Sequence, residues 1–552
     1  MFKSINQYYK NIPAISLTSF NLILATWITF ILNFGFLKTI HTLTPYQGIK
    51  SFLFVIATSL VLVGLYNLIF QIIQWKYTAK IFALLFIFVG GFSAYFVNSL
   101  GVLITPDQIQ NMIQTDPNEV FDLLNPRFFI WFFLIILLPM LFVYFVKLKP
   151  ESIPQISIKK AISAIISFLV IMLLLFVYYV DYASIFRENR TLKGMISPQN
   201  TFSSAYSYYK NKMPKENLPF VHYGEDAKLV QTVSQPSPAK LMVLVVGETA
   251  RAESFSLNGY AKKTNPQLEK LDVINFPQVS SCGTATAVSV PCMFSGMTRK
   301  NYDEHLAVRR DTLLDIAQRA GYKVTWIDNN SGCKETCNRV NQFVIPQKIK
   351  DKWCKDGECD DGILVDSLKY YIDQIPKNDT TPQLIVLHQM GSHGPAYYKR
   401  SATGFQPFQP TCNSSSIQGC DQQALLNTYD NSIVYTDHIL SSVIDILKQP
   451  SHYQTGFWYL SDHGESTGEH GLYLHGSPYA IAPTQQTHVP MMMWFSSSWK
   501  DHNSAQVKCL TEQKNQQVSQ DNLFPTMLSM LNIQTHVIDK DINILNQCKA
   551  SV

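Results

Sequence analysis

The sequence predicts an N-terminal domain of five transmembrane helices, followed by a C-terminal, exported α/β domain with a largely parallel central sheet. Five long apolar stretches fill the first third of the 552-residue chain. All 10 cysteines lie after these stretches. Beyond residue 240, short apolar runs alternate with helix-like stretches, a pattern typical of α/β domains.

Each of the five apolar stretches has about the 20 residues needed to cross the core of a bilayer. A buried helix of a globular protein could account for any one of them. Five in succession without an interior charge indicate instead a membrane domain over residues 1–181. The predicted spans are residues 14–36, 51–73, 81–104, 128–146 and 161–180.

Basic residues in the short loops predict the orientation of these spans, because lysine and arginine concentrate on the cytoplasmic side. Lysines precede the first span and occupy the loops after the second and fourth spans, whereas acids collect in the alternate loops. We therefore expect a cytoplasmic N-terminus, with everything after the fifth span on the opposite side. No small-residue cleavage site follows the first span, which favours an anchor over a removed signal peptide.

The cysteines support export independently, since an even number confined to one part favours a disulfide framework in an oxidising compartment. Their spacing predicts four local pairs and leaves two cysteines for a fifth: Cys282–Cys292, Cys333–Cys337, Cys354–Cys359, Cys412–Cys420 and Cys509–Cys548. The alternative is a zinc ribbon of Cys333, Cys337, Cys354 and Cys359. Loose spacings and the oxidising compartment disfavour it.

Residues 182–240 are predicted to form a bridging linker rich in aromatic and polar residues. Tyrosine and lysine together suit the lipid–water interface, so we expect an interfacial linker, with an ordinary solvated linker as the alternative. The net charge of +5 is modest and gives no reason to expect nucleic-acid binding.

Residues 241–552 are predicted to form one α/β domain. Apolar strands are expected within residues 241–251, 322–330, 383–394 and 455–464, and helices over residues 312–320, 362–375 and 423–447. Strands that are apolar throughout indicate a buried, largely parallel sheet, whose ligands bind beyond the carboxyl ends of the strands. Every one of these strands ends in candidate chemistry: Glu248, Asn329 and Asn330, His393, and Asp462 and His463.

The segment 461–476, SDHGESTGEHGLYLHG, is dense in histidines and carboxylates, which are zinc ligands. Glu248, Asp462 and His463 would provide three ligands and leave a fourth position open, which is the pattern of catalytic zinc. A solvated, glycine-rich loop with incidental histidines is the alternative for this segment taken alone.

The loop 282–292, CGTATAVSVPC, offers Thr284, Thr286 and Ser289 between two cysteines. It is placed to open a helix, whose N-terminus favours a phosphate or an alkoxide. A threonine hydroxyl becomes a useful nucleophile once a metal lowers its pKa. The alternative is that these residues are polar loop filler.

Together with the five spans, the motifs VVGETAR, SCGTATAVSVPCMFSG, DNNSGCK, MGSHGP, SDHGES and YLHG resemble the lipid A phosphoethanolamine transferases. This family includes the mobile colistin-resistance enzymes and belongs to the alkaline phosphatase/sulfatase superfamily. The resemblance covers nearly the whole chain and implies a sulfatase-like fold for the C-terminal domain.

The resemblance implies roles for individual residues. Thr286 would be the nucleophile, and the catalytic zinc would be bound by Glu248, Thr286, Asp462 and His463. The phosphoethanolamine group would be surrounded by Asn330, Lys334, His393, Glu465 and His475. The loop 109–124 would line the lipid substrate pocket with Asn111, Thr115 and Glu119. At His470 the family has asparagine as well as histidine, so no ligand role is implied.

The implied reaction transfers phosphoethanolamine between two lipids. Thr286 attacks the phosphorus of phosphatidylethanolamine, diacylglycerol leaves, and a phosphate of lipid A then attacks the phosphoethanolamine-threonine. A second metal on His393 and His475, or a role for both as neutral phosphate donors, are equally open. The enzyme is expected to be a monomer in the Gram-negative inner membrane with a periplasmic catalytic domain, and to give polymyxin and colistin resistance.

Other functions make distinct predictions. The acceptor could be a core sugar of lipopolysaccharide or another glycan. A phosphoglycerol transferase of the lipoteichoic acid synthase type is disfavoured by the cysteines and the CGTATAVSVPC loop. A sulfatase is disfavoured by the missing C/S-x-P-x-R motif. A non-catalytic binding domain predicts a broken ligand set, whereas Glu248, Thr286, Asp462 and His463 are all present.

Overall fold

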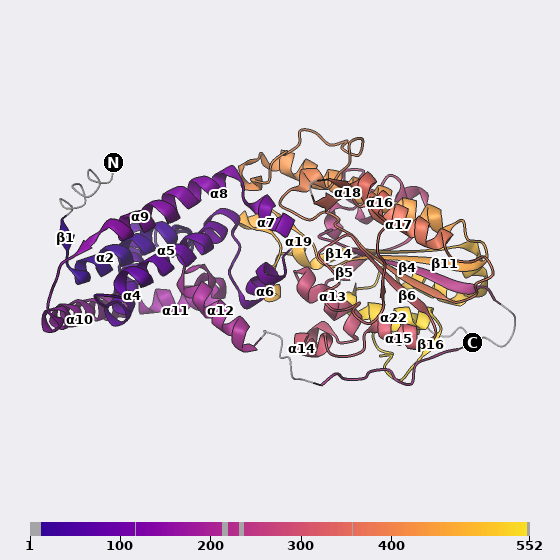
Figure 1. Cartoon of the computed structure of the whole chain (residues 1–552), viewed down its shortest axis with the longest axis horizontal. Helices are drawn as coiled ribbons and strands as arrows, with labels where there is room; N and C mark the ends of the chain where they lie inside the picture. Colours follow the sequence, from indigo (N-terminus) through magenta and orange to yellow (C-terminus); the bar gives the residue numbers. More distant parts are fainter. Residues whose placement is uncertain (1–12, 116, 212–218, 231–236, 356, 549–552) are drawn as a thin grey trace. The chain divides into compact units, whose positions relative to one another are not determined.

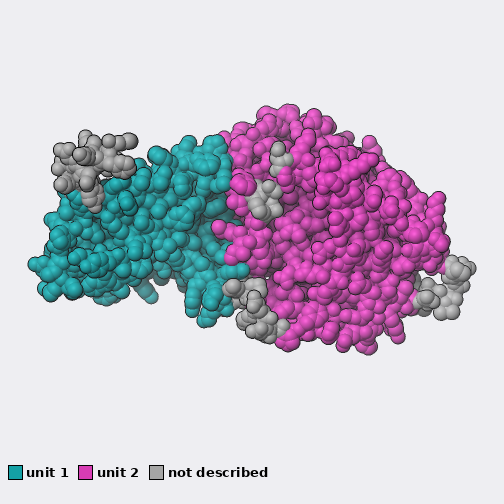
Figure 2. Space-filling model, in the orientation of Figure 1, with its two compact units in different colours: residues 1–109, 124–211 teal, residues 110–123, 212–552 magenta. Residues whose placement is uncertain are grey.

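The computed structural model describes residues 13–115, 117–211, 219–230, 237–355 and 357–548. Its contacts divide the chain into two compact units (Figure 2). The first comprises residues 1–109 and 124–211, and the second comprises residues 110–123 and 212–552. The segment 110–123 therefore packs with the C-terminal unit although it lies between two apolar helices in sequence.

The first unit is helical. Within the described residues, four helices are long and apolar enough to cross a membrane: Ile49–Ile73, Ala79–Leu100, Pro126–Phe145 and Ile153–Val177. A fifth span results if Leu17–Leu32 and Phe34–Leu43, which meet at a 63° bend, are counted as one. The helices are α2 (Leu17–Trp27), α3 (Phe34–Leu43), α4 (Ile49–Ile73), α5 (Ala79–Tyr95), α8 (Pro126–Trp131), α9 (Leu138–Phe145), α10 (Ile153–Val177), α11 (Tyr179–Glu188) and α12 (Gln199–Asn211).

The bend interrupts the first predicted span, 14–36, at Asn33. The Asn33 amide donates to Ile28 O at 3.1 Å and to Ser197 O at 2.8 Å, and its oxygen accepts from Ser197 N at 2.8 Å. These bonds to a distant backbone replace a straight helical continuation, as polar insertions into a helical ladder do. The apolar pattern carries no signal for this break.

The second unit is built on an eight-stranded sheet with the order β15-β5-β14-β11-β4-β10-β6-β7. The strands are β4 (Ala239–Gly247), β5 (Ile274–Ser280), β6 (Lys323–Asp328), β7 (Asn341–Gln342), β10 (Gln383–His388), β11 (Tyr453–Ser461), β14 (His488–Phe495) and β15 (Val518–Ser519). Only β14 runs against its neighbours, so the prediction of a largely parallel sheet is confirmed. The four predicted strands are present, whereas β5 and β14 were not predicted.

Helices cover both faces of this sheet (Figure 1). One face packs α13 (Thr286–Ser295), α15 (Leu313–Arg319) and α22 (Leu523–Met530), and the other packs α16 (Gln347–Trp353), α17 (Gly362–Asp373) and α18 (Gln422–Leu447). Even-numbered side chains of β4 enter the first core and odd-numbered ones the second, as strand geometry requires. The same alternation places the side chain of Glu248 on the α13 side.

Shorter elements complete the second unit and its border. They are α6 (Pro106–Gln114), α7 (Pro117–Leu123), α14 (Glu304–Ala307), α19 (Thr484–Thr487), α20 (Ser497–His502), α21 (Ser504–Gln513) and the strand pairs β3 (Lys228–Leu229) with β16 (Ile533–Gln534), β8 (Cys354–Lys355) with β9 (Glu358–Cys359), and β12 (Ser466–Thr467) with β13 (Tyr473–Leu474). A further pair in the first unit joins β1 (Ala14–Ile15) to β2 (Lys147–Leu148).

All 10 cysteines form the five predicted disulfides, and no cysteine of the chain is free. The prediction of local pairing is confirmed. The alternative zinc ribbon is wrong, because its four sulfurs are bonded in pairs, Cys333 with Cys337 and Cys354 with Cys359.

Candidate active site

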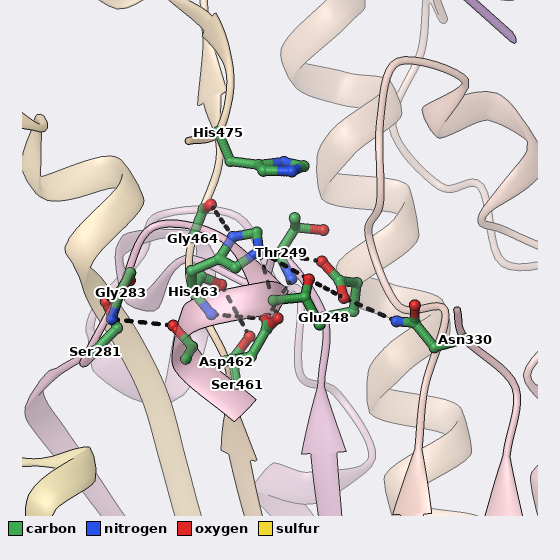
Figure 3. Close-up of polar contacts among 12 residues, drawn as sticks. Glu248, Thr249, Ser281, Gly283, Asn330, Ser461, Asp462, His463, Gly464 and His475 are labelled. Carbon is green, nitrogen blue, oxygen red and sulfur yellow. Dashed lines mark hydrogen bonds and ion pairs between the residues drawn. The ribbon is translucent and has the colours of Figure 1, made fainter. Parts of the chain in front are cut away.

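Three ligand-type side chains converge beyond the carboxyl ends of β4 and β11 (Figure 3). One ligand atom each from Glu248, Asp462 and His463 lies within 4.8 Å of the others. His463 Nε2 is 3.4 Å from Glu248 Oε1 and 3.4 Å from Asp462 Oδ2. The parallel pairing of β4 with β11 brings these residues together although they are far apart in sequence.

Thr286 lies beside this cluster as a fourth polar group. Its Oγ1 lies 3.3 Å from His463 Nε2 and donates to Glu248 Oε2 at 3.0 Å. A tetrahedral zinc with bonds of about 2.1 Å separates its ligands from one another by about 3.4 Å. The distances of His463 Nε2 to the other three groups match that spacing.

Burial makes this cluster unfavourable without a cation. Glu248 Oε1 and Asp462 Oδ2 are buried and accept no hydrogen bond within the described structure. Burial, and then the neighbouring Asp462, raises the pKa of Glu248, and burial raises the pKa of Asp462 to about 6. Burial lowers the pKa of His463 to about 4, which keeps its imidazole neutral at pH 7. A neutral imidazole beside two buried carboxylates fits a divalent metal.

Backbone contacts orient the atoms that face the centre of the cluster. His463 Nδ1 lies 2.9 Å from the Gly464 carbonyl, which leaves Nε2 to face the cluster. Asp462 Oδ1 accepts from Thr249 N at 3.2 Å and from His463 N at 2.7 Å, so only its other oxygen points inward. The cluster is thus held by the turns that carry it.

Thr286 is the first residue of α13, which confirms that the 282–292 loop opens a helix. The loop before it is fixed on several sides. Cys282 bonds to Cys292, Cys282 N donates to Gln520 Oε1 at 2.7 Å, and Thr284 Oγ1 donates to Ser477 O at 2.6 Å. These contacts aim the Thr286 hydroxyl at the cluster.

Two further histidines and a glutamate stand next to the cluster. The ring of His475 lies 4.5 Å from that of His463 and 5.3 Å from that of His393. Glu465 is fully buried, with its Oε2 3.5 Å from His475 Nδ1. Burial, and then His475, puts the pKa of His393 well below its usual value, so this imidazole is neutral at pH 7.

Asn330 and Lys334 follow β6 on the other side of Glu248. The Asn330 amide donates to Glu248 Oε2 at 2.8 Å and to Gln389 O at 2.7 Å. Lys334 Nζ donates to Ser331 Oγ at 2.8 Å and to Gln114 O at 3.4 Å. Lys334 therefore links the site loop to the end of α6.

The expected lipid-pocket residues are not all described. Asn111 lies in α6, and Thr115 donates back to Asn111 O at 2.6 Å. The side chain of Glu119 lies outside the described residues. His470 is exposed, whereas its neighbour Glu469 bonds Arg251 at 2.8 Å.

Residues 62–213 match the family model described as phosphoethanolamine transferase EptA/EptB, and residues 240–533 match the sulfatase model. Phosphoethanolamine transferase EptA of Salmonella typhimurium is 40% identical over 541 residues, which is 97% of this chain and 98% of that protein. The chain belongs to the phosphoethanolamine transferase family.

Other members of the phosphoethanolamine transferase family agree. Phosphatidylethanolamine transferase Mcr-1 of Escherichia coli is 35% identical over 485 residues, covering 85% of this chain and 88% of its own. The solved integral membrane protein lipooligosaccharide phosphoethanolamine transferase A of Neisseria meningitidis superposes with a TM-score of 0.91 at 34% identity, covering 97% of this chain and all of its own. The predicted family and sulfatase-like fold are confirmed.

In this phosphoethanolamine transferase, several supporting residues were missed by the sequence reasoning. Asp328 and His388 end neighbouring strands and lie 2.8 Å apart through Asp328 Oδ1 and His388 Nδ1. In each strand, alternate residues face α13, and Asp328 and His388 are the next residues of these two series. This alternation is a sequence signal from which both residues could have been predicted. Asp361 accepts from Met390 N at 2.9 Å and Gly391 N at 2.8 Å.

Gly391 and Gln520 make close contacts with the backbone around the site. A Cβ on Gly391 would lie 2.5 Å from Glu248 O, so only glycine lets this loop approach Glu248 so closely. Gln520 donates to Ser461 O and Asp462 O, both at 2.7 Å, while it also accepts from Cys282 N. One side chain thereby ties the Thr286 loop to the loop that carries Asp462 and His463, and nothing in its sequence context indicates this.

We expect the Cys282–Cys292 disulfide to matter more for activity than for stability. A Cys282→Ser/Cys292→Ser variant should lower the transferase rate several-fold, because the bond fixes the loop that aims Thr286. Closing loops of 10 and 39 residues stabilises by about 3 and about 4 kcal/mol, respectively, in the chain-entropy model.

The matched control is Cys509→Ser/Cys548→Ser, which should lower the thermal midpoint at least as much yet leave the specific rate of the folded enzyme near that of the wild type. Equal rate losses in both variants would mean that the first disulfide has no special role at the site. Thermal melts and rates measured on the same preparations separate the two outcomes.

Proposed function

We propose that this enzyme transfers phosphoethanolamine from phosphatidylethanolamine to a phosphate of lipid A, through a phosphoethanolamine-threonine intermediate on Thr286. The observation that carries the proposal is the position of Thr286 Oγ1, within 3.3 Å of His463 Nε2 and 3.0 Å of Glu248 Oε2. A hydroxyl at the edge of a metal-type cluster suits nucleophilic catalysis.

A zinc ion is the cofactor that this donor set fits. It would be held by Glu248, Thr286, Asp462 and His463, and when bound it would supply Lewis acidity and lower the pKa of the Thr286 hydroxyl. Two observations support this assignment: Glu248 and Asp462 each have a buried oxygen that accepts no hydrogen bond in the described structure, and His463 is neutral.

In the first half-reaction, Thr286 Oγ1 forms a bond to the donor phosphorus and the bond from phosphorus to the diacylglycerol oxygen breaks. Glu248 Oε2 faces the hydroxyl proton of Thr286 and would accept it, and the diacylglycerol oxygen takes up this proton as it leaves. Asn330 holds that same Glu248 oxygen, which keeps the acceptor of the proton in place. Phosphoethanolamine is then esterified to Thr286.

The phosphoryl oxygens would be met by neighbouring donors. His393 is neutral and offers one N–H, and the ring of His475 lies near those of both His393 and His463. Lys334 brings a positive charge from the loop after β6. Donors prearranged around a developing negative charge stabilise the transition state more than the ground state. Glu465, buried beside His475, would orient that ring.

In the second half-reaction, a phosphate oxygen of lipid A forms a bond to the phosphorus and the bond from phosphorus to Thr286 Oγ1 breaks. The proton of the attacking phosphate restores the threonine hydroxyl. A covalent intermediate explains the use of threonine, because the group must be kept while one lipid replaces another. The name of the Neisseria relative, a lipooligosaccharide phosphoethanolamine transferase, supports an acceptor of this class.

A second candidate acceptor is a Kdo sugar. The Escherichia coli protein named Kdo(2)-lipid A phosphoethanolamine 7''-transferase is 24% identical over 487 residues. The higher identity, 40% over 97% of the chain, is to phosphoethanolamine transferase EptA, so the Kdo acceptor stands second.

The proposed placement follows the apolar helices. Residues 1–181 would span the inner membrane with a cytoplasmic N-terminus, residues 182–240 would form a linker at the interface, and residues 241–552 would form the periplasmic catalytic domain of a monomer. The five disulfides support an oxidising compartment. Asn111, Thr115 and Glu119 would contact the donor lipid.

The test is expression of the full chain in a Gram-negative host that lacks its own phosphoethanolamine transferases. Mass spectrometry should find lipid A carrying added phosphoethanolamine, and the cells should tolerate more polymyxin, because an added ammonium group weakens attraction for a cationic peptide. Phosphoethanolamine on core sugars with unmodified lipid A phosphates would favour the second candidate. Unmodified lipopolysaccharide would contradict both.

A further inference from the structure

The segment 110–123 combines exposed apolar side chains with a buried acid. Met112, Ile113 and Phe121 are 49%, 63% and 69% exposed. Asp122, next to Phe121, is only 9% exposed. Exposed apolar residues on short helices between membrane spans suit a lipid surface, whereas a buried carboxylate needs partners within the protein.

Those partners are two consecutive basic residues of the catalytic unit. Lys399 Nζ donates to Asp122 Oδ1 at 2.5 Å, and Arg400 Nη2 lies 3.8 Å from Asp122 Oδ2. Glu358, in β9, lies on the other side of the same pair, 3.7 Å from Lys399 Nζ and 3.2 Å from Arg400 Nη1. These two acids and two bases all line a pocket of about 690 Å³.

Arg400 connects this group of charged residues to His393 of the candidate active site. Its Nε donates to the backbone carbonyl of His393 at 3.0 Å, and its side chain is only 6% exposed. Glu358 and His393 O together hold the guanidinium on the catalytic unit. Asp122 contacts this anchored arginine from the 110–123 segment. Among the described residues of that segment, it makes the one charged contact with Arg400.

We infer that Asp122 is a positioning residue that docks the lipid-facing segment 110–123 onto the anchored pair Lys399–Arg400, and so presents the donor lipid to the site of His393. The inference rests on the proposed function and deepens it. A carboxylate paired with two cations in a mostly buried setting holds position better than a surface ion pair does. Loss of Asp122 frees the segment, whereas Glu358 still holds Arg400.

Two donors distinguish positioning of the lipid from damage to the catalytic centre. Phosphatidylethanolamine in mixed micelles needs the lipid-facing segment, and a water-soluble p-nitrophenyl ester of phosphoethanolamine needs only the catalytic centre. With full-length protein, Asp122→Asn should lower kcat/KM for phosphatidylethanolamine about 10-fold, mainly through KM, and change the soluble ester by less than about twofold. The soluble ester also reports that the variant is folded.

Glu358→Gln is the matched control, because it removes the other acid from the same two bases. It should leave the ratio of the two kcat/KM values unchanged, because Glu358 holds Arg400 in place and makes no part of the contact with the 110–123 segment. The double variant Asp122→Asn/Lys399→Met should show the ratio of Asp122→Asn alone, because the two residues act through one contact.

An unchanged ratio in Asp122→Asn, or an equal change of ratio in Glu358→Gln, would overturn the inference. Failure of the wild type to release diacylglycerol from phosphatidylethanolamine would instead contradict the proposed function itself. The two failures are therefore distinguishable in one set of assays.

Discussion

A Thr286→Ala variant is expected to release no diacylglycerol from phosphatidylethanolamine above background. The change removes the hydroxyl that lies 3.0 Å from Glu248 Oε2 and 3.3 Å from His463 Nε2. Removal of a covalent nucleophile lowers kcat by about 10³-fold or more. Diacylglycerol release by the purified full chain measures this directly.

Two further variants calibrate the loss. Thr286→Ser keeps a hydroxyl and should retain measurable turnover. Thr284→Ala removes the neighbouring hydroxyl, which is committed to Ser477 O, and should cost far less than Thr286→Ala. Mass spectrometry of acid-quenched enzyme should find phosphoethanolamine on the peptide that contains Thr286. Turnover by Thr286→Ala near the wild-type rate would exclude this nucleophile.

The second large effect concerns zinc. Purified enzyme should contain at least one zinc per chain, and His463→Ala should lose both the zinc and the transfer activity, because Nε2 of this imidazole faces Glu248 and Asp462 at 3.4 Å each. Metal removal should also lower the thermal midpoint, since a metal that binds only the folded state stabilises it. Elemental analysis and melting curves provide readouts independent of activity.

His470→Ala is the matched control, because this histidine lies in the same segment but is exposed. It should keep the zinc content and the activity of the wild type. Zinc loss in His470→Ala, or a fully active enzyme free of metal, would contradict the assignment of the ligands. Readdition of zinc to the chelated wild type should restore both the midpoint and the rate.

The parts of this site that could be predicted from sequence share one physical origin. Buried parallel strands are recognisable as apolar runs, and their carboxyl ends meet at one edge of the sheet. The proximity of Glu248 to the Asp462–His463 pair is therefore predictable from the sequence alone. Local cysteine spacing predicted four of the five disulfides for a similar reason, because short loops bring their ends together, and Cys509 and Cys548 were the two cysteines that remained.

The rest depends on contacts that no local pattern encodes. Gln520 lies in a turn remote from both loops that it joins, and its role follows only from their approach in space. The break at Asn33 depends on Ser197, which is far away in sequence. Strand β14 has an apolar sequence, but nothing in that sequence specifies that it runs opposite to β11.

The order of strands in the sheet has a consequence for synthesis of the chain. Strand β4 is flanked by β10 and β11, both of which are made much later. The newly made chain therefore carries an apolar strand, LMVLVVG, with two open edges, and open edges template pairing with other chains. Aggregation of the nascent protein should be most favourable in this interval, and chains truncated before β11 should be the most dependent on chaperones.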